Sequence, residues 1–89
     1  MKIKENYVLR QVAQTWIVMP LAEENKKLNG MLTLTDSGAM LWQLLEQGCE
    51  LSVLADALTR EYEVSEAKAR EDAEKFIEKL MQLGCLSAD

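Results

Sequence analysis

The first third of the chain alternates apolar and polar residues with the two-residue period of β-strands. Two segments show this period, residues 7–12 and 15–20, and both are rich in β-branched and aromatic side chains. Only Ala13 and Gln14 separate them, so the pattern predicts a tight hairpin, although this pair is not one of the favoured glycine-containing turns. Pro20 has no N–H to donate to a ladder and is expected to close the second strand.

A third strand is expected at residues 31–34, after a polar connection over 21–28 and the turn signal Asn29-Gly30. Three consecutive strands with short links favour an antiparallel meander whose first and third strands lie at its edges. Edge strands are normally protected by lysine, proline or a bulge, and this third strand carries no charged residue and no proline. The pattern therefore predicts a sheet edge that can take up an extended peptide.

From Thr35 onward the apolar residues recur with a helical period. Thr35 is a candidate N-cap, and the first helix is expected to end at Gly48. A second helix is predicted over about 51–63, and a third runs from its cap Ser65 to a left-handed stop at Gly84. The expected apolar faces are Leu51, Leu54, Ala55, Leu58 and Tyr62 on the second helix, and Ala69, Ala73, Phe76, Ile77, Leu80 and Leu83 on the third.

Three strands followed by three helices predict an α+β fold, with a small antiparallel sheet packed on a three-helix unit, in one domain over residues 1–89. The hydrophobic content of 48% is that of an ordinary globular protein. No apolar run reaches the roughly 18 residues of a membrane helix, and the N-terminus lacks the apolar segment of a secretory signal. A cytoplasmic protein without a membrane partner is expected.

Charge is unevenly distributed. Residues 35–89 carry twelve acidic and five basic side chains, a net charge of −7, whereas the whole chain carries −5. This balance argues against non-specific nucleic-acid binding, which depends on clustered Lys and Arg. It would suit a partner with basic segments, although a solvated acidic surface explains it as well.

The residues that usually carry catalysis are missing from the sequence. It contains no histidine, no metal-ligand cluster and no glycine-rich phosphate loop, so no enzyme activity, metal or cofactor is expected. Cys49 and Cys85 are interpreted as small buried residues beside helix ends rather than as a redox pair. Trp42 is expected in the core, whereas Trp16 fits either the core or an exposed aromatic contact with a partner.

Six short stretches between residues 30 and 86 form a recognisable series, within a resemblance that spans residues 7–86. They are Gly30-Met31-Leu32-Thr33-Leu34, then Thr35-Asp36-Ser37-Gly38-Ala39-Met40-Leu41-Trp42, then Leu54-Ala55 with Glu61-Tyr62-Glu63-Val64, and finally Phe76-Ile77-Glu78-Lys79-Leu80 before Gly84-Cys85-Leu86. In this order and spacing they resemble the PqqD family. The resemblance implies a winged-helix-like fold known as the RiPP recognition element, a non-catalytic peptide chaperone that holds the leader of a ribosomally made precursor peptide.

The resemblance also implies a partner and a place for the peptide. The leader would add as a strand beside the third strand and lie against the third helix, and its core would be presented to a modifying enzyme, often a radical S-adenosylmethionine enzyme. Phe76 would form an apolar floor, and the charged residues would pair with charges on the leader. Carried onto this chain, the peptide-binding residues are Met31, Leu32, Thr33, Leu34, Asp72, Lys75, Phe76 and Lys79.

Two other functions remain open. A winged-helix DNA-binding or regulatory module would read DNA with residues 65–83, but these carry five acidic and four basic side chains, a poor complement to phosphate. A structural partner subunit would use the same sheet edge to form a homodimer without any peptide ligand.

Overall fold

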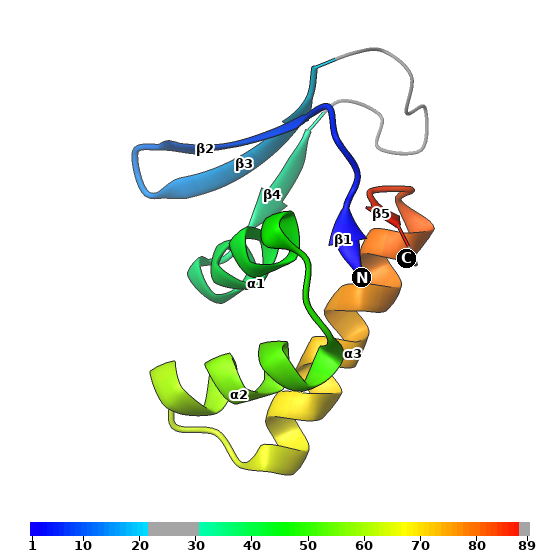
Figure 1. The fold of residues 1–89 in the computed structure, drawn as a ribbon. Helices are drawn as coiled ribbons and strands as arrows, with labels where there is room; N and C mark the ends of the chain where they lie inside the picture. The colour runs from blue at the N-terminus through cyan, green and yellow to red at the C-terminus, as the bar shows by residue number, and fades with distance from the viewer. Residues whose placement is uncertain (22–30, 88–89) are drawn as a thin grey trace.

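A computed structural model describes residues 1–21 and 31–87 of the chain (Figure 1). A three-stranded sheet packs on one side of a helical unit, and residues 2–3 lie beside residues 86–87 near the end of the last helix. The expected α+β, winged-helix-like arrangement is confirmed. The elements are β1 (Lys2–Ile3), β2 (Tyr7–Val12), β3 (Thr15–Pro20), β4 (Leu32–Leu34), α1 (Asp36–Gln47), α2 (Leu51–Glu61), α3 (Glu66–Gln82) and β5 (Leu86–Ser87).

The sheet is the predicted antiparallel meander, in the order β2-β3-β4. Both strands of the hairpin have the predicted bounds, and Ala13 adopts a left-handed conformation with φ of 57°. Two-residue hairpin turns require such positive φ values, so alanine supplies here what glycine or asparagine usually supplies. The third strand is shorter than expected because it begins at Leu32 rather than Met31, and the predicted Asn29-Gly30 turn lies outside the described residues.

One face of the sheet contributes to the core. Val18 is fully buried, and Leu32 and Leu34 are nearly so. They belong to the same cluster as Trp42 and Leu45 of α1, which lies directly under the sheet (Figure 1). Alternate residues of a strand point to opposite faces, so Thr33, between the two buried leucines, is exposed.

The helix boundaries follow local capping chemistry. The Thr35 hydroxyl accepts a hydrogen bond from the Gly38 amide at 3.1 Å, and the Ser65 hydroxyl does the same for Lys68 at 3.1 Å. Gly84 has a φ of 75° and ends α3 as expected. The prediction for the second helix was wrong at its end, because α2 stops at Glu61.

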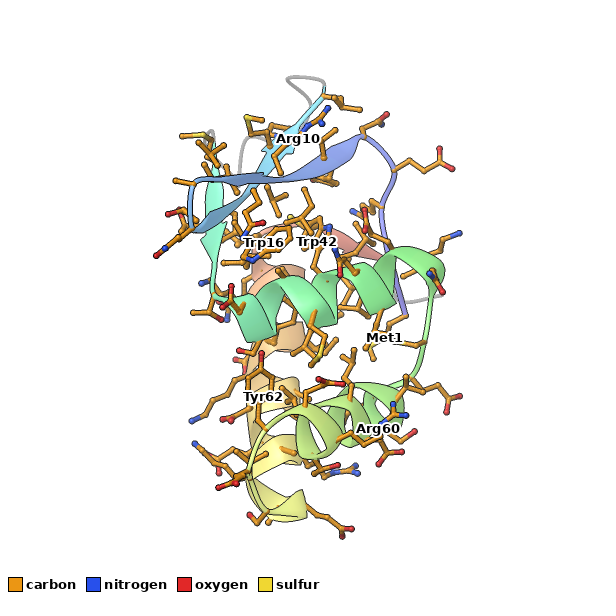
Figure 2. The ribbon with its side chains drawn as sticks, turned by 90° about the vertical axis from the view of Figure 1, so that its left-hand side faces the viewer. Met1, Arg10, Trp16, Trp42, Arg60 and Tyr62 are labelled. Carbon is orange, nitrogen blue, oxygen red and sulfur yellow. The ribbon has the colours of Figure 1, made fainter. Side chains whose placement is uncertain are left out.

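Tyr62 was expected on the apolar face of α2, but it lies after the last residue of this helix. Its backbone is extended, with φ of −134° and ψ of 153°, and 40% of the residue is exposed. The chain leaves the helix here because it must turn within a few residues to reach the cap of α3 (Figure 2). A helical spacing of apolar residues predicts burial only for residues that belong to the helix, and Tyr62 does not.

Two short strands were not predicted, and they join the ends of the chain. β1 pairs antiparallel with β5, with Ile3 opposite Leu86, and both side chains are buried. The Lys4 amide donates to the Cys85 carbonyl at 2.9 Å, which extends the pairing. Strands of two residues are too short to produce a periodic pattern in the sequence.

The aromatic and sulfur-containing side chains have distinct environments. Trp42 is fully buried as predicted, and its ring meets that of Tyr7 edge to face at 6.0 Å. Trp16 is half-buried, and its Nε1 donates to Asp36 Oδ1 at 3.0 Å. Cys49 is half-buried and Cys85 is buried, both as free thiols, and burial raises the pKa of each.

Candidate functional site

A hollow of about 230 Å³ lies between the end of β4, the start of α1 and one face of α3. Five of the eight residues predicted to bind peptide line it, namely Thr33, Leu34, Asp72, Phe76 and Lys79. Asp72, Phe76 and Lys79 are spaced by four and three residues, so they lie on one face of α3. Residues 33–34 and residues 72–79 are distant in the sequence, and the fold brings them to the same hollow.

The apolar part of the hollow depends on a close approach at Gly38. A Cβ atom at this position would lie 3.5 Å from Phe76 Cε1 and 3.5 Å from Leu34 Cβ, and only 3.3 Å from Thr35 Oγ1. Gly38 is therefore the point where α1 approaches both α3 and β4. Further lining residues that sequence reasoning did not identify as part of the site are Thr35, Ser37, Gly38, Leu41 and Leu58.

Charged side chains border the hollow on the α3 side. Asp72 forms an ion pair with Lys68 at 3.1 Å, whereas Lys79 is exposed. Lys75 does not line the hollow; its Nζ lies 2.9 Å from Glu71 Oε1, and this hydrogen bond raises the pKa of Lys75 and lowers that of Glu71. Lys75 is thus already engaged by a neighbour one helical turn away.

Hydrogen bonding along the hairpin shows which backbone groups of β4 point outward. The Leu21 amide donates to the Asn6 carbonyl at 2.7 Å, so the pair of residues 6 and 21 is hydrogen-bonded. Antiparallel pairs alternate between hydrogen-bonded and non-hydrogen-bonded, and the register continues from Tyr7 opposite Pro20. The N–H and C=O groups of residues 17 and 19 therefore point toward β2, and those of residues 16 and 18 toward β4.

The same alternation then assigns the groups of β4. Trp16 lies opposite Leu34, and Val18 lies opposite Leu32, so these are the hydrogen-bonded pairs between β3 and β4. The N–H and C=O of Thr33 point away from β3, along the outer edge of the sheet. Within residues 1–21 and 31–87, no strand pairs with this outer edge.

The four predicted strand residues therefore differ in the groups that they present to a peptide at this edge. Leu32 and Leu34 are 8% and 7% exposed, so they serve mainly as core residues, although Leu34 also lines the hollow. Thr33 presents its backbone outward. Met31 precedes β4 and is 62% exposed. No pattern in the sequence distinguishes Thr33 from its neighbours, because the direction of its amide depends on the register of three strands.

The described part of the chain lacks the features of two other kinds of site. Among those residues, no helix is both long enough and apolar enough to cross a membrane. No group of three or more His, Cys, Asp or Glu within them is placed to hold a metal ion.

Comparison with known proteins gives both a fold and a family. The structure of TbiB1 in complex with the TbiA(beta) leader peptide is similar with a TM-score of 0.80 and 24% identity, over 100% of this chain and 98% of that one. Lasso peptide synthetase B1 complexed with the leader peptide is similar with a TM-score of 0.75 and 22% identity, over 94% and 93% of the two chains. No curated protein matches the sequence. Residues 15–86 match the family described as Coenzyme PQQ synthesis protein D, and this chain therefore belongs to the PqqD family.

Proposed function

We propose that this protein binds the leader segment of a ribosomally made precursor peptide and presents the peptide to a modifying enzyme. The leader adds as a fourth strand along the outer edge of β4, and its side chains enter the hollow beside α3. The observation that carries the proposal is the outward-facing backbone of Thr33 beside a hollow with an apolar floor. Main-chain hydrogen bonds supply affinity in this mode of recognition, and pockets for alternate side chains supply specificity.

Two similar folds support the choice of ligand. Both TbiB1 and lasso peptide synthetase B1 were solved in complex with leader peptides. Their similarity to this chain extends over nearly the full length of each protein, which includes the elements that form the edge and the hollow. In this proposal the protein itself carries out recognition, and a separate enzyme, such as a radical S-adenosylmethionine enzyme, carries out the chemistry in the cytoplasm.

The lining residues have different roles in the proposed complex. Phe76 and Leu34 contact apolar side chains of the leader, which gain stability by leaving water. Asp72 and Lys79, at the border of the hollow, can pair with charges on the leader, whereas Lys75 must first leave Glu71 to do so. Each such pair contributes about 0–1 kcal/mol because it stays in contact with water. Met31 extends the backbone edge beyond Thr33. The ladder and the apolar contacts therefore supply most of the affinity, and the charges select among leaders.

Replacing Thr33 with proline tests the proposal sharply. Proline removes the outward N–H and places its ring on the edge, but it leaves the inward bonds of Leu32 and Leu34 to β3 intact. We expect at least about tenfold weaker leader binding, because a hydrogen bond and the close approach of the strand are both lost. The measurement is an NMR titration of labelled protein with leader peptides encoded beside its gene. It monitors the backbone amide signals of residues 31–34 and 72–79, without residue 33 in the proline variant.

Two variants serve as controls. Thr33→Ala keeps the backbone N–H and should bind the leader nearly as well as the wild type. Leu32→Pro removes an amide that points toward Val18, and this variant should lose stability as well as binding. Unchanged affinity in a folded Thr33→Pro protein would contradict strand addition at this edge.

A further inference from the structure

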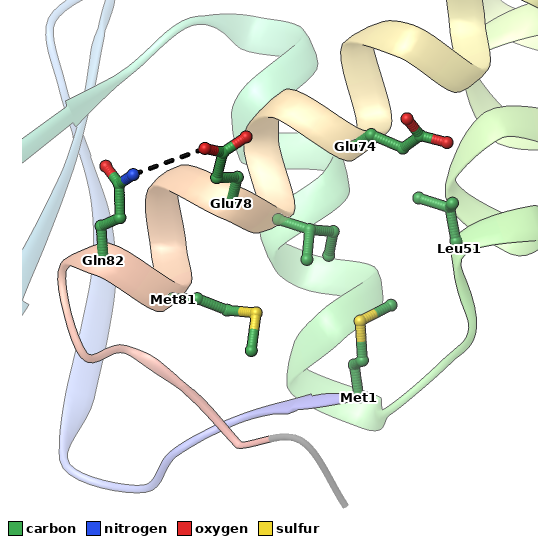
Figure 3. Close-up of a pocket in the computed structure, with 7 residues that line it drawn as sticks. Met1, Leu51, Glu74, Glu78, Met81 and Gln82 are labelled. Atoms are coloured by element: carbon green, nitrogen blue, oxygen red, sulfur yellow. Dashed lines mark hydrogen bonds between the residues drawn. The ribbon is translucent and has the colours of Figure 1, made fainter.

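A second hollow, of about 300 Å³, lies on another side of α3 (Figure 3). Its walls are Met1, Leu51, Ile77 and Met81, contributed by the N-terminus, the start of α2 and the second half of α3. Met81 is 50% exposed and lies outside the apolar face expected for α3. This volume is at the low end of the roughly 300–1,000 Å³ of small-molecule pockets, which suits side chains of a partner protein better than a cofactor.

The two hollows lie on opposite sides of α3. Each residue of an α-helix advances by about 100°, so Met81 lies about half a turn around the axis from Asp72. Glu74 and Glu78 belong to the Met81 side, whereas Phe76 and Lys79 belong to the Asp72 side. A molecule bound in one hollow therefore leaves the other hollow free.

The border of the second hollow is acidic. Glu74 and Glu78 are the ionisable side chains among its lining residues, and Gln82 completes the border. Glu74 is paired with Arg70 at 3.2 Å, whereas Glu78 accepts a long hydrogen bond of 3.5 Å from Gln82 (Figure 3). The amino group of Met1 donates to the Cys49 carbonyl at 3.1 Å. Glu78 is therefore the carboxylate best placed to receive a positive charge.

We propose that this hollow docks an amphipathic helical segment of a protein partner, with Lys or Arg residues beside its apolar face. Large apolar side chains, spaced three and four residues apart, fill the space between Met1, Leu51, Ile77 and Met81. The basic residues lie over Glu78 and Glu74. Helix-in-groove recognition uses this spacing of anchors, and charges at the border favour basic over acidic partners.

A second copy of this chain fits the same surface poorly. In a two-fold symmetric contact the two acidic borders come together, and the lining residues include no Lys or Arg that could pair with Glu74 or Glu78 of the other copy. Like charges held close together across a contact oppose association. The acidic border thus selects a different protein, one that brings positive charge. The proposal goes beyond leader binding and does not depend on it, since the two surfaces are separate.

Methyl resonances of methionine provide a direct test. Protein labelled at its methionine methyl groups and its backbone amides is titrated at low salt with a synthetic helical peptide of about 18 residues, with leucines at helical spacing and flanking lysines. We expect saturable shifts of the Met1 and Met81 methyls, while the Thr33 amide stays unshifted. A second peptide, with glutamates in place of the lysines, should bind at least tenfold more weakly.

Matched variants distinguish docking in this hollow from non-specific binding of the peptide. Met81→Ser should abolish the shift of the Met1 methyl, whereas Met19→Ser, at a comparably exposed position of β3, should not. Glu78→Lys should weaken binding of the basic peptide, and Glu63→Lys, which changes the net charge equally beyond the far end of α2, should not. Equal binding of both peptides, or no shift at Met81, would overturn the proposal. Neither result would affect leader binding, which is read at Thr33.

Discussion

The hydrogen bond between Trp16 and Asp36 joins two elements that belong to different parts of the fold. Trp16 lies on β3, and Asp36 is the first residue of α1, where a carboxylate also stabilises the positive end of the helix dipole. The bond therefore holds the sheet to the helix beneath it. Its Nε1–Oδ1 distance is 3.0 Å, and the two side chains remain partly open to water.

Trp16→Phe should lower the free energy of unfolding by about 0.5–1.5 kcal/mol, since it removes the donor and keeps most of the apolar ring. Chemical denaturation measures this loss. A double-mutant cycle with Asp36→Ala isolates the pair, because each single variant then removes the bond from one side. If Trp16→Phe costs the same in the Asp36→Ala background as in the wild type, packing rather than the hydrogen bond holds Trp16.

The sequence predicts the burial or backbone conformation of a residue well where one local rule determines it. Trp42 falls on a mid-helix apolar position and is buried, and Gly84 ends α3 with the left-handed conformation expected of it. Tyr62 follows the same helical spacing but lies after the last residue of α2, so its exposure depends on where the helix ends. Trp16 fits two environments equally until its distant partner Asp36 is known.

The two capped helices allow a comparison at the scale of elements. Thr35→Ala and Ser65→Ala each remove a hydroxyl that accepts a backbone amide at 3.1 Å. Each should lower stability by about 1 kcal/mol, which corresponds to roughly 4–8 °C in the melting temperature of a domain of this size. Only Thr35 also lines the hollow beside β4, so only Thr35→Ala should weaken leader binding as well. A leader affinity equally unaffected in both variants would place the peptide away from the start of α1.

Elements were predictable in proportion to their length. The six-residue strands and the three helices show a clear period, and their positions were correct to within two residues. β1 and β5 have two residues each and are held by contacts between opposite ends of the chain, so no local pattern reveals them. The candidate site lies between these extremes. A family resemblance named five of its ten lining residues, but the outward direction of Thr33 required the register of the whole sheet.

At the scale of the whole molecule, β1 and β5 close the core at one end. Ile3 is 7% exposed and lies opposite Leu86, so Ile3→Ala should cost about 2–5 kcal/mol through lost burial and the cavity that remains. Val12→Ala, at a position that is 58% exposed, should change stability by no more than about 0.5 kcal/mol. Equilibrium unfolding in denaturant compares the two. Equal costs would mean that the terminal strands add little to the core.

The pairing of Lys2 with Ser87 has a consequence for how this fold can be rebuilt. Because these residues are neighbours across a ladder, a short linker between them would close the polypeptide into a ring without moving either strand. New ends could then be opened at the exposed turn of Ala13 and Gln14, where few contacts are lost. In such a circular permutant the free ends lie at the tip of the hairpin, and a fused enzyme or reporter would be attached there instead of beside β1 and β5.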